Sequence, residues 1–220
     1  MKRFFAVLVI MLFSLNAFAL ESDVELFQDM KYEKKINEIG FRVLNANKLQ
    51  NRAMFRYYSE RNPLKLKANF RNGTISVNRG VILALEDDDE LAAVLAQQIA
   101  LVQLSNKGSF RGFFFPIQYD LFSPRKYNYM ADKRAVDYLV NAGYHPVALI
   151  VALNKIYPQT RYDWYAHLPR TSKRMMRVYE YIYTKYPEYL VHNKYLNNTY
   201  YQNFLLISAK EREAFKKKVK

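Results

Sequence analysis

Two adjacent primary amides, Gln97 and Gln98, lie in the middle of the apolar run LAAVLAQQIALVQL at residues 91–104. This run is long enough for a helix that is buried over much of its surface. A buried amide without a hydrogen-bond partner costs about 1–3 kcal/mol, so both glutamines need polar neighbours. Neither side chain has a basic group that accepts a proton. The pair therefore predicts a polar site inside a helix, in which neither residue acts as a general base.

The positions of Gln97, Gln98 and Leu101 have the spacing of the H-E-x-x-H motif. In that motif two histidines four residues apart on a helix bind zinc, and the glutamate after the first one takes a proton from the metal-bound water. An amide oxygen binds zinc poorly, and leucine does not bind it at all. The motif's spacing is therefore present without its chemistry.

The segment TISVNRGVILALEDDDELAAVLAQQIAL at residues 74–101 resembles the strand and helix of the HtpX-like and BepA-like zinc metallopeptidases, the family that includes the CaaX prenyl endopeptidases. The resemblance implies that the family's first zinc-binding histidine falls on Gln97 and its catalytic glutamate on Gln98. Its second histidine falls on Leu101. All three family residues are replaced in this chain.

The resemblance continues in NYMADKRAVDYLVNAGYHPVAL at residues 128–149. Asn128 occupies the position of the family's third zinc ligand, a glutamate, and an asparagine does not replace a carboxylate as a zinc ligand. The resemblance implies that Asp132 corresponds to a family residue that orients one of the zinc-binding histidines. The second helix of the family's site is therefore also represented, again without its ligand.

A third match is AHLPRTSKR at residues 166–174, which is similar to the family's T-H-P followed by an arginine. His167 and Arg174 are the counterparts, although Leu168 separates the histidine from the proline. The resemblance thus implies a vestigial pocket formed by Asp132, His167 and Arg174. It also implies an extended polypeptide held along the edge of a strand.

Other catalytic patterns are absent from the sequence, which has neither a G-x-S-x-G elbow nor a G-x-x-x-x-G-K phosphate loop. The histidines His145, His167 and His192 do not have the i, i+4 spacing of a zinc motif. We therefore expect no zinc and no other cofactor. The alternative is a metalloendopeptidase with a non-standard ligand set.

The elements that position these residues can be predicted from hydrophobic periodicity and turn signals. Asp87 and Glu90 form a capping box that starts a helix, Asn72-Gly73 indicates a hairpin, and Gly143 ends a helix. The predicted fold class is α+β, a mostly helical metallopeptidase-like domain with a small sheet or hairpin. One of its helices is the helix that carries H-E-x-x-H in the family, here without those residues. The predicted helices lie within residues 21–50, 87–105, 127–141, 146–157 and 173–186, and the predicted strands at 52–58 and 64–70.

Residues 1–19 have the three parts of a secretory signal peptide: basic Lys2 and Arg3, an apolar run, and small residues ending at Ala19. The expected mature chain, residues 20–220, forms one domain of this metallopeptidase-like kind. Removal of Lys2 and Arg3 leaves 32 basic and 20 acidic residues, a formal charge of +12. With no cysteine to carry a lipid anchor or a disulfide, the expected location is the bacterial periplasm.

These features favour an exported pseudo-protease that acts by binding an envelope protein or peptide. The basic charge leaves a second possibility, a binder of anionic lipid or cell-wall polymer, and export argues against nucleic acid. Phe113, Phe114 and Phe115 are a candidate contact loop. Tyr179 and Tyr183 belong to a tyrosine-rich basic region whose helical spacing favours core packing over ligand stacking.

Overall fold

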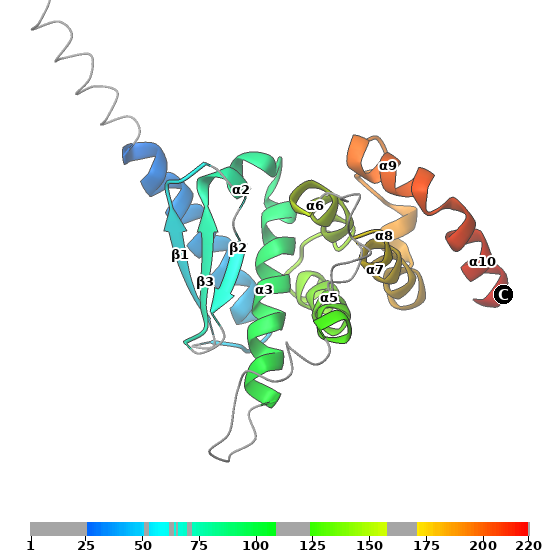
Figure 1. Cartoon of the computed structure of the whole chain (residues 1–220), viewed down its shortest axis with the longest axis horizontal. Coiled ribbons are helices and arrows are strands. Elements are labelled where there is room, and N and C mark those ends of the chain that lie inside the picture. The colour runs from blue at the N-terminus through cyan, green and yellow to red at the C-terminus, as the bar shows by residue number, and fades with distance from the viewer. Residues whose placement is uncertain are drawn as a thin grey trace, which may run out of the picture.

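The computed structural model describes residues 26–50, 53–61, 64, 66–69, 72–108, 124–157 and 171–219. A small sheet lies at one end, and helices follow it in layers towards the C-terminus (Figure 1). The predicted mostly helical α+β fold is confirmed. The predictions for residues 1–19, for His167 and for Phe113, Phe114 and Phe115 lie outside the described residues.

The sheet has three strands, β1 (Met54–Tyr58), β2 (Leu66–Asn69) and β3 (Thr74–Asn78), in the order β1-β3-β2. The predicted hairpin is confirmed: β2 pairs with β3 antiparallel, and Gly73 takes a φ of 70° that suits glycine. The backbone N–H of Thr74 donates to the side chain of Asn72 at 3.0 Å. The parallel pairing of β1 with β3 was not predicted.

A helical segment at residues 26–46 packs behind the sheet in the view of Figure 1. Its apolar side buries Ile36, Val43 and Leu44, as the periodicity predicted. Gly40 allows close approach to the sheet, because a methyl group there would lie 2.4 Å from the ring of Phe55. The segment thus covers one face of the sheet.

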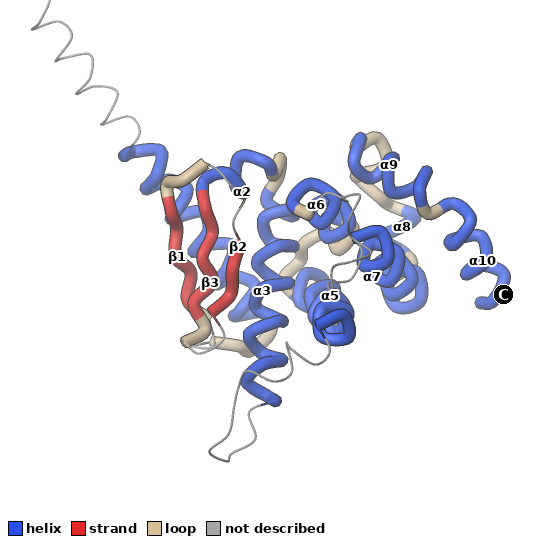
Figure 2. Tube along the Cα trace, in the orientation of Figure 1, coloured by secondary structure: helices blue, strands red, loops and turns tan. Residues whose placement is uncertain are grey.

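Helix α3 (Asp88–Gly108) follows the short helix α2 (Arg79–Ala84) and runs between the sheet and the other helices (Figure 2). It contacts β2 and β3 on one side and α5 (Pro124–Asn141) and α6 (Ala148–Ile156) on the other. Both predicted helices are therefore present, α3 and α5 each being about one turn longer at one end than expected. The helix α5 ends as predicted, with Gly143 at a φ of 74° and the N–H of Tyr144 donating to the carbonyl of Leu139.

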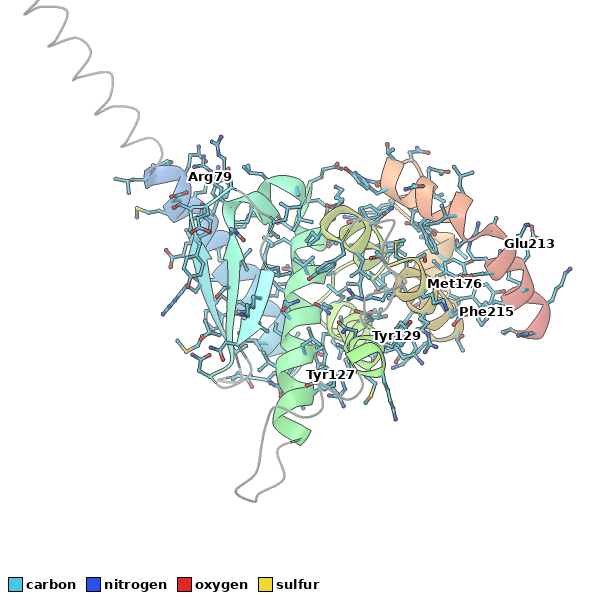
Figure 3. All side chains as sticks on the ribbon, in the orientation of Figure 1. Arg79, Tyr127, Tyr129, Met176, Glu213 and Phe215 are labelled. Atoms are coloured by element: carbon cyan, nitrogen blue, oxygen red, sulfur yellow. The ribbon has the colours of Figure 1, made fainter. Side chains whose placement is uncertain are left out.

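The remaining helices continue away from the sheet: α7 (Thr171–Lys185), α8 (Glu188–Val191), α9 (Thr199–Ile207) and α10 (Ala209–Val219). Tyr179 and Ile182 of α7 are buried, and Tyr183 packs edge-on against Phe215 of α10 (labelled in Figure 3). The expected core role is confirmed for Tyr179 and Ile182, and Tyr183 is partly buried against the core. None of the helices in the described part of the chain is long and apolar enough to cross a membrane.

Gly80 occupies a position where no side chain fits. A methyl group on its Cα would lie 1.9 Å from the carbonyl oxygen of Arg61, so it would collide with the backbone and not with a flexible side chain. The connection from β3 into α2, and from there into α3, passes through this point. Gly80 is therefore required for the path that delivers α3 to the centre of the domain.

We expect Gly80→Ala to lower the free energy of unfolding by about 1–3 kcal/mol, since the backbone must move to admit the methyl group. Leu83→Ala is the control, because Leu83 lies on the same helix and is 53% exposed; it should cost less than about 0.5 kcal/mol. Urea unfolding measures both. Equal losses in the two variants would show that the close approach does not constrain the connection.

Candidate functional site

The start of α3 is held by local and distant contacts. The Asp87 carboxylate accepts from the N–H of Glu90 at 2.8 Å, as the predicted cap requires. The Glu90 carboxylate accepts from the N–H of Glu86 at 2.9 Å and from the Lys155 ammonium of α6 at 2.9 and 3.0 Å. Glu90 is completely buried, and this burial raises its pKa in spite of the adjacent Lys155. The first turn of α3 is therefore tied to α6 by a buried ion pair.

Gln97 and Gln98 lie two turns further along α3, and each is only 3% exposed. The side-chain nitrogen Nε2 of Gln98 donates to Oε1 of Gln97 at 2.5 Å. Both side chains are therefore buried and do not lie on a solvent-exposed strip of the helix. This bond provides a partner for the buried oxygen of Gln97 and for one N–H of the Gln98 amide.

Leu101 lies one turn after Gln97 and packs in a small apolar cluster with Leu104, Tyr127 and Ala131. Its backbone carbonyl accepts from the Tyr127 hydroxyl at 3.0 Å. Tyr127 is the neighbour of Asn128 at the start of α5, so α5 is fastened to α3 beside the third ligand position. The second ligand position is therefore part of an apolar helix contact.

Asp132 and Arg174 form a buried ion pair between α5 and α7. The Arg174 atoms Nε and Nη2 donate to the two Asp132 oxygens at 2.8 and 2.7 Å, and the two residues are 6% and 1% exposed respectively. Burial opposes the charge of Arg174, but the Asp132 carboxylate outweighs this effect and the pKa of Arg174 lies above its usual value. The guanidinium carbon also lies 5.3 Å from the ring centre of Tyr157. The pair is a bidentate link that fixes α7 against α5.

The residues predicted for the site come from three helices that pack in series, α3 on α5 and α5 on α7. The structure joins Gln97 to Gln98, and Asp132 to Arg174. The third member of the expected vestigial pocket, His167, lies outside the described residues.

The side chains at the family's ligand positions do not fit zinc. The Gln97 oxygen is engaged by the Gln98 amide, Leu101 has no donor atom, and Asn128 lacks the charge of a carboxylate. Over the described ranges, no group of three or more His, Cys, Asp or Glu residues is arranged to hold a metal ion.

Sequence reasoning missed Lys155 and Tyr127. Lys155 is the only charged residue in the apolar stretch VALIVALNKI of α6, and a lysine there signals a buried partner. That signal does not identify the partner, which lies 65 residues away. The contact of Tyr127 with the backbone of Leu101 has no sequence signal, because any residue offers a carbonyl oxygen.

Comparison with known proteins leaves the family resemblance as an interpretation of motifs. A scan against protein-family models finds no match, and a search of curated proteins also finds none.

We expect Asp132→Asn to lower the free energy of unfolding by about 3–5 kcal/mol, because it leaves the Arg174 cation buried without a counter-ion. The double variant Asp132→Asn with Arg174→Met should recover much of this loss, since it removes the unpaired charge. Urea unfolding at constant salt measures both.

The matched control is Glu38→Gln, which breaks the exposed ion pair between Glu38 and Lys34. It should cost less than about 0.5 kcal/mol. If Asp132→Asn costs no more than this control, the buried pair does not hold α5 and α7 together.

Proposed function

We propose that this chain is an exported protein with the fold of the zinc metallopeptidases. It binds an envelope protein or peptide and does not cleave it. One observation carries the proposal: Gln97 and Gln98 are buried and hydrogen-bonded to each other at the positions of the motif's first ligand and general base. The hydrogen bond between the two amides engages the Gln97 oxygen, the atom that would otherwise face a metal ion.

Peptide hydrolysis by this family's route needs three ligands, an open metal position and a carboxylate that takes a proton from water. Gln98 has no basic group, and neither Leu101 nor Asn128 supplies the missing ligand charge. The Asp132 carboxylate is occupied by Arg174 through both of its oxygens. These features support a role other than proteolysis.

Binding of polypeptide is supported by the position of β2. This strand pairs with β3 on one side, lies against α3, and has no second partner strand within the described residues. An unpaired strand edge offers backbone N–H and C=O groups to an extended chain, which can add to the sheet. The resemblance implies the same edge, and the signal-like segment at residues 1–19 supports an envelope partner.

We expect the natural chain to hold no stoichiometric zinc when it is purified from zinc-supplied cells. A variant with Gln97→His, Gln98→Glu, Leu101→His and Asn128→Glu should hold about one zinc ion per chain, because it restores the ligand set of the family. Elemental analysis of both proteins is the measurement.

A variant that keeps Asn128 and carries only the other three changes is the control, and its zinc affinity should be at least about tenfold lower. Stoichiometric zinc in the natural chain would overturn the proposal in favour of an endopeptidase with unrecognised ligands. Absence of zinc from the fourfold variant would contradict the alignment itself.

We also expect the natural chain to bind fluorescein-labelled casein, an unfolded polypeptide, without cutting it. Anisotropy reports binding, and gel electrophoresis reports fragments. Successive N–H groups of a strand point to opposite edges, so either Lys67→Pro or Ala68→Pro removes a donor from the free edge of β2. The proline variant whose missing N–H faced the free edge breaks no bond to β3, so it should keep the stability of the natural chain. This variant should weaken casein binding by about fivefold or more.

The other proline variant is the control, because it breaks a bond between β2 and β3 and should lower stability instead. Fragments that appear with time would contradict the pseudo-protease. Complete absence of casein binding would contradict the polypeptide-binding role.

A further inference from the structure

An open groove of about 410 Å³ lies along α5 and α7. Four of its lining residues follow one face of α5 at helical spacing, and the fifth comes from α7; they are Lys126, Tyr129, Met130, Lys133 and Arg177. The three basic residues are exposed. The groove therefore combines three cations with two large side chains that offer apolar surface.

The cations of the groove are oriented by aromatic rings. The guanidinium carbon of Arg177 lies 4.0 Å from the ring centre of Tyr129, which Figure 3 labels on α5. The Lys133 ammonium lies 5.5 Å from the ring centre of Tyr181. A guanidinium stacked on a ring keeps its N–H groups free at the edge for an anionic ligand.

No carboxylate of the described residues forms an ion pair with the groove's basic side chains. Asp132 is next to Lys133 in sequence, but it is buried and pairs with Arg174. Asp137, one turn further along α5, pairs with Lys185. The positive charge of the groove is thus not neutralised by the nearest acids on α5.

The buried pair of Asp132 with Arg174 also explains why the groove keeps its shape. Lys133 follows Asp132 directly on α5, and Arg177 lies one turn after Arg174 on α7. Because the inner residues are joined at 2.7 and 2.8 Å, the outer ones are held on facing helices. The groove is therefore built by the fold and does not depend on a bound ligand to form.

The spacing of the cations indicates the kind of ligand. Lys126 and Lys133 are seven residues apart on one helix, which places their Cα atoms about 10 Å apart. A polypeptide in the extended polyproline II conformation rises about 3.1 Å per residue and has three residues per turn, so acidic side chains three positions apart lie on one face about 9 Å apart. Spaced cations match several carboxylates along a chain better than they match one compact anion.

We infer that the groove between α5 and α7 binds an acidic segment of a polypeptide, with carboxylates paired to Lys126, Lys133 and Arg177 and an apolar side chain against Met130. This inference rests on the proposed polypeptide-binding function and identifies the charge of the partner. The net charge of the chain, +14 for the full sequence, also attracts an acidic partner at longer range.

The test uses the full natural chain and a fluorescein-labelled peptide that repeats Glu-Ser-Leu, with Gln-Ser-Leu as the neutral counterpart. The acidic peptide should bind at least about tenfold more tightly than the neutral one, and higher salt should weaken it. The variant Lys133→Glu with Arg177→Glu should lose at least about tenfold in affinity for the acidic peptide. Both substituted residues are exposed, so the fold should tolerate these changes.

The matched control is Lys217→Glu with Lys218→Glu, which makes the same charge change on exposed residues of α10. It should weaken acidic-peptide binding by less than about threefold. Equal losses in the groove variant and the control would overturn the inference and assign the attraction to net charge.

Two further outcomes separate this inference from the proposed function. If the natural chain binds casein, and the groove variant binds both peptides as the natural chain does, the groove inference fails and polypeptide binding stands. A different outcome is that the natural chain binds no polypeptide but binds phosphatidylglycerol vesicles, and that the groove variant loses vesicle binding. In that case the groove inference and the proposed function both fail, and the groove is a lipid site.

Discussion

Burial of α3 is the constraint on which the rest of the structure depends. This helix lies between the sheet and the other helices, and four of its polar side chains are buried: Glu90, Gln97, Gln98 and Gln103. Glu90 obtains a counter-ion from Lys155, while Gln97 and Gln98 bond to each other. A buried polar group without a partner costs about 1–3 kcal/mol, and a buried unpaired charge costs more. Helix α6 must therefore lie where its Lys155 reaches the buried Glu90 of α3.

The helices around α3 are joined by contacts between groups of the protein itself. Asp132 and Arg174 join α5 to α7, and the Tyr127 hydroxyl joins α5 to the backbone of α3. A rigid helix layer of this kind is suited to presenting a binding surface, which agrees with the proposed role.

The charge distribution follows from the same internal pairing. Several acidic side chains are committed to partners in the protein: Asp137 accepts from Lys185 and two tyrosines, and Asp87 accepts from Tyr195 and Lys194. Burial opposes the charge of Asp87, but these donors and the N–H of Glu90 lower its pKa. Because the chain has 34 basic and only 20 acidic residues, internal pairing of acids leaves cations at the surface.

The sequence by itself determined the features that depend on a few neighbouring residues: the cap at Asp87, the hairpin at Gly73 and the helix end at Gly143. It also determined that residue 98 is not a general base, because this follows from the chemistry of an amide. Only the tertiary structure decided the parallel pairing of β1 with β3, and the pairs of Glu90 with Lys155 and Asp132 with Arg174, 65 and 42 residues apart. The choice of partner for a charge depends on which helices pack together, and no local pattern encodes that choice.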